Sequence, residues 1–423
     1  MRRASPNLTT HDAPRYMIPT SATTKNPPVS VARLLALALL TRLFTDTSFQ
    51  IFFPFLPILA AGLGTTPIVL GRLLSVQSAV GLLLPFLGSW ADRVGYRRVM
   101  RLGLLSGSAG FALLAASQGL GLAVAGLILA GLGTVTFNPI LQAYMSAWLP
   151  YNQRGRGLGI LEYSWALSGI VGLYLVGRLL AVASWRVPML IFSGGMLVAF
   201  LVYRWLPSAP HSEREQTAVS HPTPPAPWRQ RLQTFLDLGA NGRSAWANVL
   251  ITGLHRIAGF NLFIAYGTWL AADYGLGAAE LGRVALFLGT ADLCGSGLVS
   301  LISDRLGKRT SVLIGFSLII VGLILLLQPG NGLQYALLRL IIVRFGFEFS
   351  IVSHLALVSE QSPQQRGKTI TLAGASGRLG GTLAALTGPW LVATGGIVYT
   401  AFFSLLVIIP CWLLLFWLGR EPE

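Results

Sequence analysis

Long apolar runs alternate with short polar loops along almost the whole chain. Most runs hold about 20 residues or more, enough for a helix to cross about 30 Å of hydrocarbon. A helix satisfies its own backbone hydrogen bonds in lipid, and the ten-residue alternation of a membrane β-barrel does not occur. The pattern predicts an all-α membrane protein with twelve transmembrane helices. The twelve runs cover residues 33–60, 67–90, 98–117, 119–147, 158–181, 187–206, 246–270, 281–302, 309–328, 333–358, 369–392 and 396–419.

The segment 207–245 interrupts this pattern and divides the runs into six and six. Its prolines prevent a continuous helix, so we expect a cytoplasmic linker between an N-terminal six-helix bundle, 31–206, and a C-terminal one, 246–419. Around Trp228, apolar residues share one helical face beside arginines, which is typical of a short helix in the headgroup layer. The favoured interpretation is a linker that only spaces the two halves, and the interfacial helix is the alternative. The tails flank the bundles: 1–30, expected to be disordered, and 420–423, both expected to be cytoplasmic.

Composition and charge support a membrane protein. Hydrophobic residues make up 53% of the chain and charged residues 11%, against about 25% charged in soluble domains. The net charge of +16 lies mostly on one side, as the positive-inside rule requires. We therefore expect a lipid bilayer and no nucleic acid as partner, and both termini in the cytoplasm. The excess of arginine over lysine and the lack of a clear organelle-targeting pattern favour a bacterial inner (plasma) membrane. The cysteines, Cys294 and Cys411, fall inside predicted helices, which predicts neither a disulfide nor a metal site.

Two charged loops resemble each other and reveal an internal repeat. One follows the second apolar run and the other follows the eighth. Asp304 follows Asp92 by 212 residues, and Arg366 follows Arg154 by the same offset. Duplicated membrane halves are typical of secondary transporters, in which the substrate binds between the halves. The repeat therefore predicts a transporter.

The repeated loop also resembles the hallmark motif of the major facilitator superfamily: Gly, three residues, Asp-Arg, one residue, Gly and then basic residues. The resemblance implies two pseudo-symmetric six-helix bundles and a gate on the cytoplasmic side. In such a gate the carboxylate caps a neighbouring helix end and pairs with Arg. The alternative is a basic loop that only determines topology. The implied gate residues are Gly88, Asp92, Arg93, Gly95, Arg97, Arg98, Asp304, Arg305, Gly307, Lys308 and Arg309.

The end of the first run, Phe53-Pro54-Phe55-Leu56-Pro57, looks like the double-proline ending of drug:proton antiporters and related exporters. Two positions depart from that branch. Leu127 stands where the fourth helix usually carries Arg, and the segment 169–172 has no proline.

Charged residues inside the predicted helices are costly in lipid and therefore need a partner, a cavity or a function. Burial favours a protonated acid, whereas a nearby arginine favours the carboxylate. We rank Asp46 first as the proton-coupling residue, Glu348 second and Asp292 third. The full set of coupling or substrate candidates is Asp46, Arg42, Glu348, Arg344, Asp292, Arg256, His255, Arg339, Asn138 and Gln142.

Structural roles are the alternative for these charges. Arg42 and Asp46, like Arg344 and Glu348, are four residues apart and could form static pairs. Asp292 could pair with Arg378 instead. Glu162 is expected to form an inner-side salt bridge with the gating arginines.

The first and seventh runs are rich in aromatic residues, including Phe53 and Phe260, which suit an apolar substrate. They favour proton-coupled export of amphipathic, drug-like molecules. One alternative is a proton-coupled carrier of a small anionic metabolite, bound by the intramembrane arginines. An alternative of a different class is a non-transporting membrane receptor or sensor. The sequence contains no Walker loop, zinc-protease motif or nucleophile elbow, so we expect neither an enzyme nor an ATP-driven pump. We expect a monomer with no cofactor, driven by the proton gradient.

Overall fold

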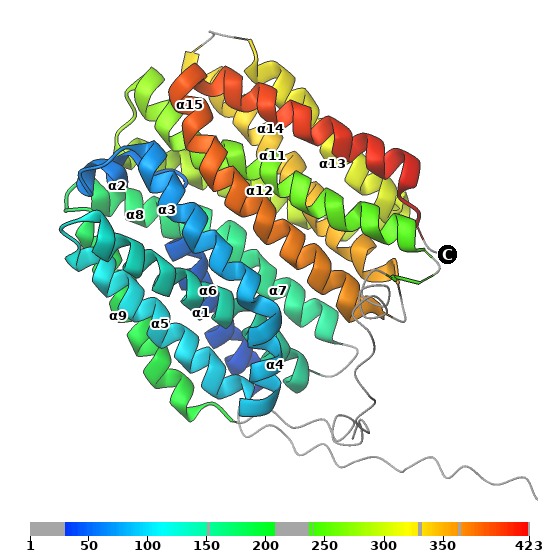
Figure 1. Ribbon diagram of the computed structural model, residues 1–423, viewed down its shortest axis with the longest axis horizontal. Coiled ribbons are helices and arrows are strands. Elements are labelled where there is room, and N and C mark those ends of the chain that lie inside the picture. Colours follow the sequence, from blue (N-terminus) through cyan, green and yellow to red (C-terminus); the bar gives the residue numbers. More distant parts are fainter. Residues whose placement is uncertain are drawn as a thin grey trace, which may run out of the picture.

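The computed structural model describes residues 30–149, 153–207, 237–239, 241–328, 332–362 and 365–421. Every regular element in these ranges is a helix, and the helices form two bundles that lie side by side (Figure 1). The N-terminal half begins with α1 (Val31–Gln50), and the C-terminal half begins with α11 (Gly242–Tyr274). The predicted all-α, two-bundle fold is confirmed.

The remaining helices follow the predicted order. The N-terminal half continues with α2 (Leu56–Gly62), α3 (Pro67–Ala79), η1 (Val80–Leu83), α4 (Leu84–Val94), α5 (Tyr96–Ala116), α6 (Leu120–Trp148), α7 (Arg154–Leu167), the π-helix η3 (Ser168–Leu173), α8 (Tyr174–Leu180), α9 (Arg186–Val202) and η4 (Tyr203–Trp205). The C-terminal half continues with α12 (Ala278–Leu306), α13 (Lys308–Leu326), α14 (Gly332–Glu360) and α15 (Arg366–Leu418).

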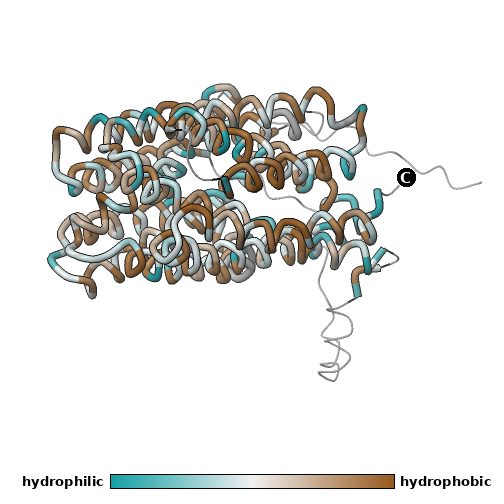
Figure 2. Tube along the Cα trace, turned by 90° about the horizontal axis from the view of Figure 1, so that it is seen from above, coloured by the Kyte–Doolittle hydropathy of each residue, from teal (hydrophilic) through white to brown (hydrophobic). Residues whose placement is uncertain are grey.

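Nine helices of the described part are long and apolar enough to cross a membrane. α15 holds two predicted spans, because Gly395 and Gly396 leave the helical conformation between them. The remaining spans are the first, which starts with α1, and the second, which combines α3, η1 and α4. Figure 2 shows hydrophobic residues along most of the helical length. The structure is that of a multi-pass membrane protein.

The first span differs from the expected continuous run. The helix ends at Gln50, and a new one begins at Leu56. Pro54 lies in the break and Pro57 in the first turn of α2. Proline lacks a backbone N–H and clashes with the preceding turn, so the double-proline ending interrupts the helix and places Phe53 in the break. The predicted tail 1–30, apart from Ser30, and the predicted interfacial helix around Trp228 lie outside the described residues.

Glycines bring the two halves together at one end of the bundle. We call the end with the chain reversals at Gly95 and Gly307 the motif side, and the other end the opposite side. A Cβ placed on Gly177 of α8 would lie 2.7 Å from Cα of Gly282 in α12. A Cβ on Gly71 of α3 would lie 2.6 Å from Cγ of Pro389 in α15. At Gly177 the two backbones therefore approach without a side chain between them, and the opposite side is closed.

The motif side is more open. α4 packs mainly against α5, α6 and η1 of its own half. The Glu162 side chain points toward α1 and α6, yet 49% of it is exposed. Leu355, two turns beyond Glu348 on the same face of α14, is 58% exposed. The described residues thus form a conformation that is closed on the opposite side and opens toward the motif side.

Candidate substrate and coupling site

Both copies of the repeated motif form tight reversals between two helices. Gly95 and Gly307 have φ values of 98° and 84°, a region that glycine enters at little cost because it lacks Cβ. Arg97 donates to the carbonyl of Leu206 at 2.6 Å, and Arg309 donates to the carbonyl of Phe416 at 2.6 Å. The same motif position therefore holds the end of the sixth span in one half and of the twelfth in the other.

Carboxylates have different places in the two copies. Asp92 accepts a hydrogen bond from the hydroxyl of Tyr96 at 3.0 Å, within its own motif. In the second copy Glu421, from the end of the chain, accepts from the backbone N–H of Lys308 at 2.8 Å. Glu421 thus caps the N-terminus of α13, where a negative charge is favourable. Sequence reasoning missed Glu421 because it assigned 420–423 to a tail.

The other gate candidates differ in what surrounds them. The Lys308 ammonium forms an ion pair with Glu360. Arg93, Arg98 and Arg305 are exposed. The surroundings of Gly88 and of the Asp304 side chain lie outside the described residues. The role of these residues as a gate stays a prediction.

In the N-terminal half a charged network joins α1, α6 and α7. Arg42 donates two hydrogen bonds to Glu162, each 2.8 Å long, and Gln142 donates to the same carboxylate at 2.7 Å. Asp46 accepts one hydrogen bond from Asn138 at 2.9 Å and another from Ser164 at 2.6 Å. Nε of Arg42 lies 3.6 Å from Asp46.

This network contains a partner that the sequence did not predict. Glu162 binds Arg42, because α1 and α7 pack side by side and bring the guanidinium opposite the carboxylate. The predicted Arg42–Asp46 pair is present as the longer contact. Asp46 is therefore held by an amide, a hydroxyl and a guanidinium at once.

In the C-terminal half Arg344 of α14 pairs with Asp292 of α12. Nε of Arg344 donates to Asp292 at 2.9 Å, and Nη2 bonds the second carboxylate oxygen. Glu348 accepts from the hydroxyl of Ser296 at 2.8 Å. The alternative pairs Arg344–Glu348 and Asp292–Arg378 are thus not formed among the described residues. A guanidinium binds a carboxylate best through two parallel hydrogen bonds, and the adjacent packing of α12 and α14 provides that geometry.

Two further candidates have local roles in the described structure. His255 lies 3.1 Å from the hydroxyl of Ser350, and its ring centre is 4.4 Å from that of Phe347. Arg339 donates to the carbonyl of Gln328 at 3.0 Å. Each of these contacts joins helices or helix ends within the C-terminal half, so neither residue bridges the halves through them.

An aromatic cluster crosses the boundary between the halves. Trp165 of α7 stacks on Phe260 of α11, with ring centres 6.4 Å apart and planes 5° from parallel. Phe53, in the break of the first span, contacts Phe260 at 5.7 Å and Phe263 at 6.4 Å. Phe347 of α14 completes the cluster through Phe263 at 4.7 Å. Sequence reasoning missed Phe347 because α14 was judged by its charged residues alone.

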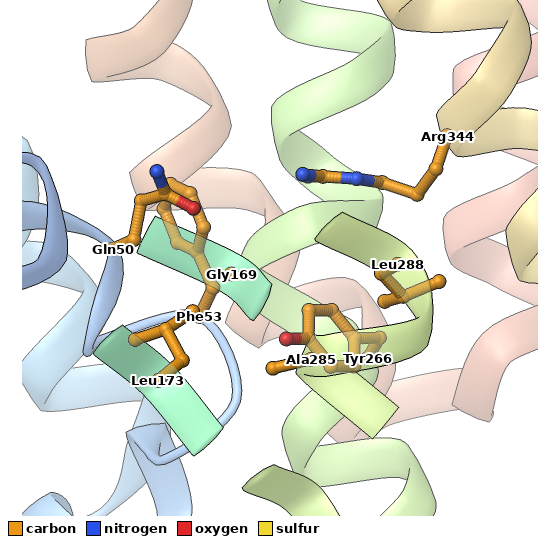
Figure 3. A pocket seen from close by; sticks show the side chains of 8 residues that line it. All are labelled: Gln50, Phe53, Gly169, Leu173, Tyr266, Ala285, Leu288 and Arg344. Atoms are coloured by element: carbon orange, nitrogen blue, oxygen red, sulfur yellow. The ribbon is translucent and has the colours of Figure 1, made fainter. Parts of the chain in front are cut away.

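Two pockets adjoin this cluster, and Phe53 lines both. In the first, Gln50 and Phe53 of the N-terminal half face Tyr266 and Arg344 of the C-terminal half (Figure 3). The second, which we call the aromatic pocket, is mostly apolar. It is lined by Phe49, Phe52, Phe53, Leu74, Gln77, Ser78, Phe260, Ile264, Gly381 and Ala385.

Two six-helix bundles with pockets between them define a multi-pass membrane transport protein, not an enzyme. The family model described as Major Facilitator Superfamily matches residues 38–254 and 248–423. The chain belongs to this superfamily, as the repeated motif implied.

Relatives and solved structures agree with this assignment. The uncharacterized MFS-type transporter YwfA of Bacillus subtilis is 27% identical over 365 residues, 86% of each chain. The uncharacterized MFS-type transporter YceJ of the same organism is 26% identical over 270 residues, 63% of this chain and 65%, just under two thirds, of that protein. The crystal structure of a D-xylose-proton symporter has a TM-score of 0.74 at 17% identity, over 93% of this chain and 99% of that one. At this identity the structural likeness shows the fold.

Proposed function

We propose that this chain moves an amphipathic small molecule across the membrane by alternating access, driven by protons. The observation that carries the proposal is the aromatic cluster, because its rings belong to both halves. A molecule bound beside Phe53 and Phe260 contacts both halves, so the rocking of one half against the other changes its surroundings. Only a ligand that binds the two conformations differently can shift the equilibrium between them.

For an uncharged or cationic substrate, which would exchange with protons, the direction we propose is export. The break at Phe53-Pro54 is the feature that resembles the exporter branch, and the aromatic pocket suits a ligand with an apolar body. With the motif side in the cytoplasm, as the distribution of arginines and lysines predicts, the described conformation opens inward. An exporter would collect its substrate in this state.

For the coupling residue, the contacts favour Glu348 over Asp46. Asp46 has three partners in a network that extends over three helices. Glu348 is 9% exposed and accepts a single described hydrogen bond, from Ser296. A buried carboxylate without a directly bound cation is costly when ionised. Gain and loss of a proton at Glu348 therefore requires less rearrangement than at Asp46. A similar structure is named a proton symporter, and proton coupling in this chain remains our proposal.

Flux measurements in proteoliposomes test the proposal. A pH-sensitive dye inside the vesicles reports proton movement while cationic dyes, lipophilic drugs and organic anions are added without ATP. We expect an amphipathic compound to trigger proton flux in the wild type. Glu348→Gln should lose this flux but keep exchange of labelled substrate. Glu280→Gln is the matched control, because Glu280 is exposed and pairs with Arg283.

Two outcomes would contradict the proposal. Binding of a compound without any flux would assign the chain to the receptors. Proton flux that survives in Glu348→Gln and disappears in Asp46→Asn would return the coupling role to Asp46.

A further inference from the structure

Two arginines inside the C-terminal half have no acidic partner among the described residues. Arg256 lies in the middle of α11 and Arg378 near the middle of the first span of α15. The ion pairs of the described part of the chain involve neither of them. A cation at such depth is costly unless it meets a partner or a water-filled cavity. The Asp292–Arg344 pair shows that this half does neutralise other intramembrane charges.

Both arginines lie at one end of the aromatic pocket. Two pocket residues lie one helical turn from the arginines: Phe260 from Arg256, and Gly381 from Arg378. A third, Ser78, lies one turn from Gly81, which contacts Arg378. Phe260 follows Arg256 by four residues, and its ring centre lies 4.9 Å from the guanidinium carbon. Gly381 follows Arg378 by three residues. Ser78 precedes Gly81, which touches Arg378: a Cβ there would lie 2.6 Å from Cδ of Arg378. The pocket thus has an apolar body and a cationic end on the motif side.

The surrounding charges do not balance the two arginines. Arg378, Glu348 and Glu162 are the charged groups that act on Arg256 electrostatically. Glu162 already binds Arg42, which also contacts Asp46. Among the described residues, that leaves Glu348 as the one carboxylate that acts on Arg256 and has no bound cation of its own. A positive charge therefore remains at the end of the pocket, and it increases when Glu348 is protonated.

We infer that the aromatic pocket binds an organic anion. Its carboxylate or sulfonate lies at Arg256 and Arg378, and its apolar or aromatic body lies against Phe53 and Phe260. A guanidinium fork matches the geometry of a carboxylate and stacks on aromatic faces. This assignment of a substrate class rests on the proposed transport function for its physiological meaning. The competing role for Arg256 is a contact with Glu162 that forms when the motif side closes.

Equilibrium binding to the purified full chain in lipid nanodiscs tests the inference. The probes are 1-naphthaleneacetate and its neutral amide, which differ in charge and share the apolar body. We expect the wild type to bind the acid more tightly than the amide. Arg256→Gln and Arg378→Gln should each weaken binding of the acid about tenfold, the loss of one charge-assisted interaction. Amide binding should stay unchanged, which also shows that the variants fold.

Matched variants separate the two roles of Arg256. Arg256→Lys should keep part of the preference for the acid, and Arg283→Gln, at an exposed ion pair outside the pocket, should keep all of it. Equal binding of acid and amide by the wild type would overturn the inference. So would the same loss of both probes in Arg256→Gln and Glu162→Gln, because it assigns Arg256 to the closing contact.

Failure of the inference and failure of the transport function give different results. Acid-selective binding without flux of any compound would keep the anion site and overturn transport. Equal flux of acid and amide would keep transport and overturn the anion site.

Discussion

Arg344 and Asp292 form a bidentate ion pair between α14 and α12, and this pair leaves Glu348 without a bound cation. Arg344 is four residues from Glu348 and could have neutralised it within the same helix. Because Arg344 binds Asp292 instead, the charges of the C-terminal half fall into two groups. One is the neutralised pair, which we call the closed pair, and the other is the charges without a bound partner of opposite charge among the described residues, which we call the open set. The open set consists of Glu348, Arg256 and Arg378. Substrate and proton are therefore expected to act on the open set.

The first prediction concerns the linkage between anion and proton. Glu348 and a bound anion compete for the positive charge of Arg256, while Asp292, Arg344 and Glu162 also act on Glu348. Protonation of Glu348 removes one negative charge, so anion affinity should rise as pH falls. By reciprocity, a bound anion should favour the protonated Glu348, so an anion is expected to move in the same direction as the proton. Glu348→Gln, which resembles the protonated form, should bind 1-naphthaleneacetate more tightly than the wild type.

The measurement is the affinity for the acid as a function of pH, in a range where the probe itself stays ionised. The wild type should show a slope, and Glu348→Gln should show none. Binding of the amide serves as the control and should not depend on pH in either protein. A slope that persists in Glu348→Gln would place the titrating group elsewhere.

The second prediction concerns the closed pair. Asp292→Asn leaves the buried Arg344 without its acid, and removal of one partner of a buried pair costs about 3–5 kcal/mol. The thermal unfolding temperature in detergent should fall strongly. The double variant Asp292→Asn/Arg344→Gln should be less destabilised than the sum of the two single changes. Glu280→Gln, at an exposed pair, should leave the unfolding temperature almost unchanged. Additive single effects would show that the two side chains do not stabilise each other.

The third prediction concerns the motif glycines. Alanine at Gly95 or Gly307 must adopt a φ near 98° or 84°, and such backbone strain costs about 1–3 kcal/mol. We expect a lower unfolding temperature and reduced flux in both variants. Gly121→Ala is the control, because no atom lies within 4 Å of the added Cβ. Equal stability of all three variants would mean that the reversals relax without cost.

Much of the fold could be predicted from the sequence, because the length of an apolar run determines whether a helix crosses the membrane. The predicted run 309–328 became α13 (Lys308–Leu326), and the run 119–147 became α6 (Leu120–Trp148). The break after Gln50 was missed, although Pro54 and Pro57 signalled it. The repeated motif correctly identified two equivalent reversals. In each half the glycine adopts the positive φ of the turn, and the arginine binds a backbone carbonyl at the end of the last span.

The pairing of the charges was harder to predict. Spacing along one helix shows which side chains share a face, as with Arg344 and Glu348, but it does not show which neighbouring helix that face meets. The partners Asp292 and Glu162 come from neighbouring helices, and only the packing of α12 on α14 and of α1 on α7 brings them within reach. Phe347 was missed for the same reason, because its role depends on Phe263 of α11.

The last prediction concerns the equilibrium between conformations. A side chain at Gly177 would place Cβ 2.7 Å from both the carbonyl oxygen of Ala278 and Cα of Gly282. Backbone atoms at such a close approach cannot turn away as a flexible side chain can. Gly177→Val should therefore destabilise the conformation that is closed on the opposite side and shift the population toward the one in which the motif side is closed.

A cysteine on the motif side can report this shift. In a Cys294→Ser background, Leu355→Cys places a thiol on the exposed face of α14. A membrane-impermeant maleimide should label it several-fold more slowly when Gly177→Val is added, because the motif side is then closed more of the time. Gly194→Val is the matched control, since the space around Gly194 is open to 4 Å, and it should leave the labelling rate unchanged. Equal rates in both valine variants would show that the contact between Gly177 and Gly282 does not control the opening of the motif side.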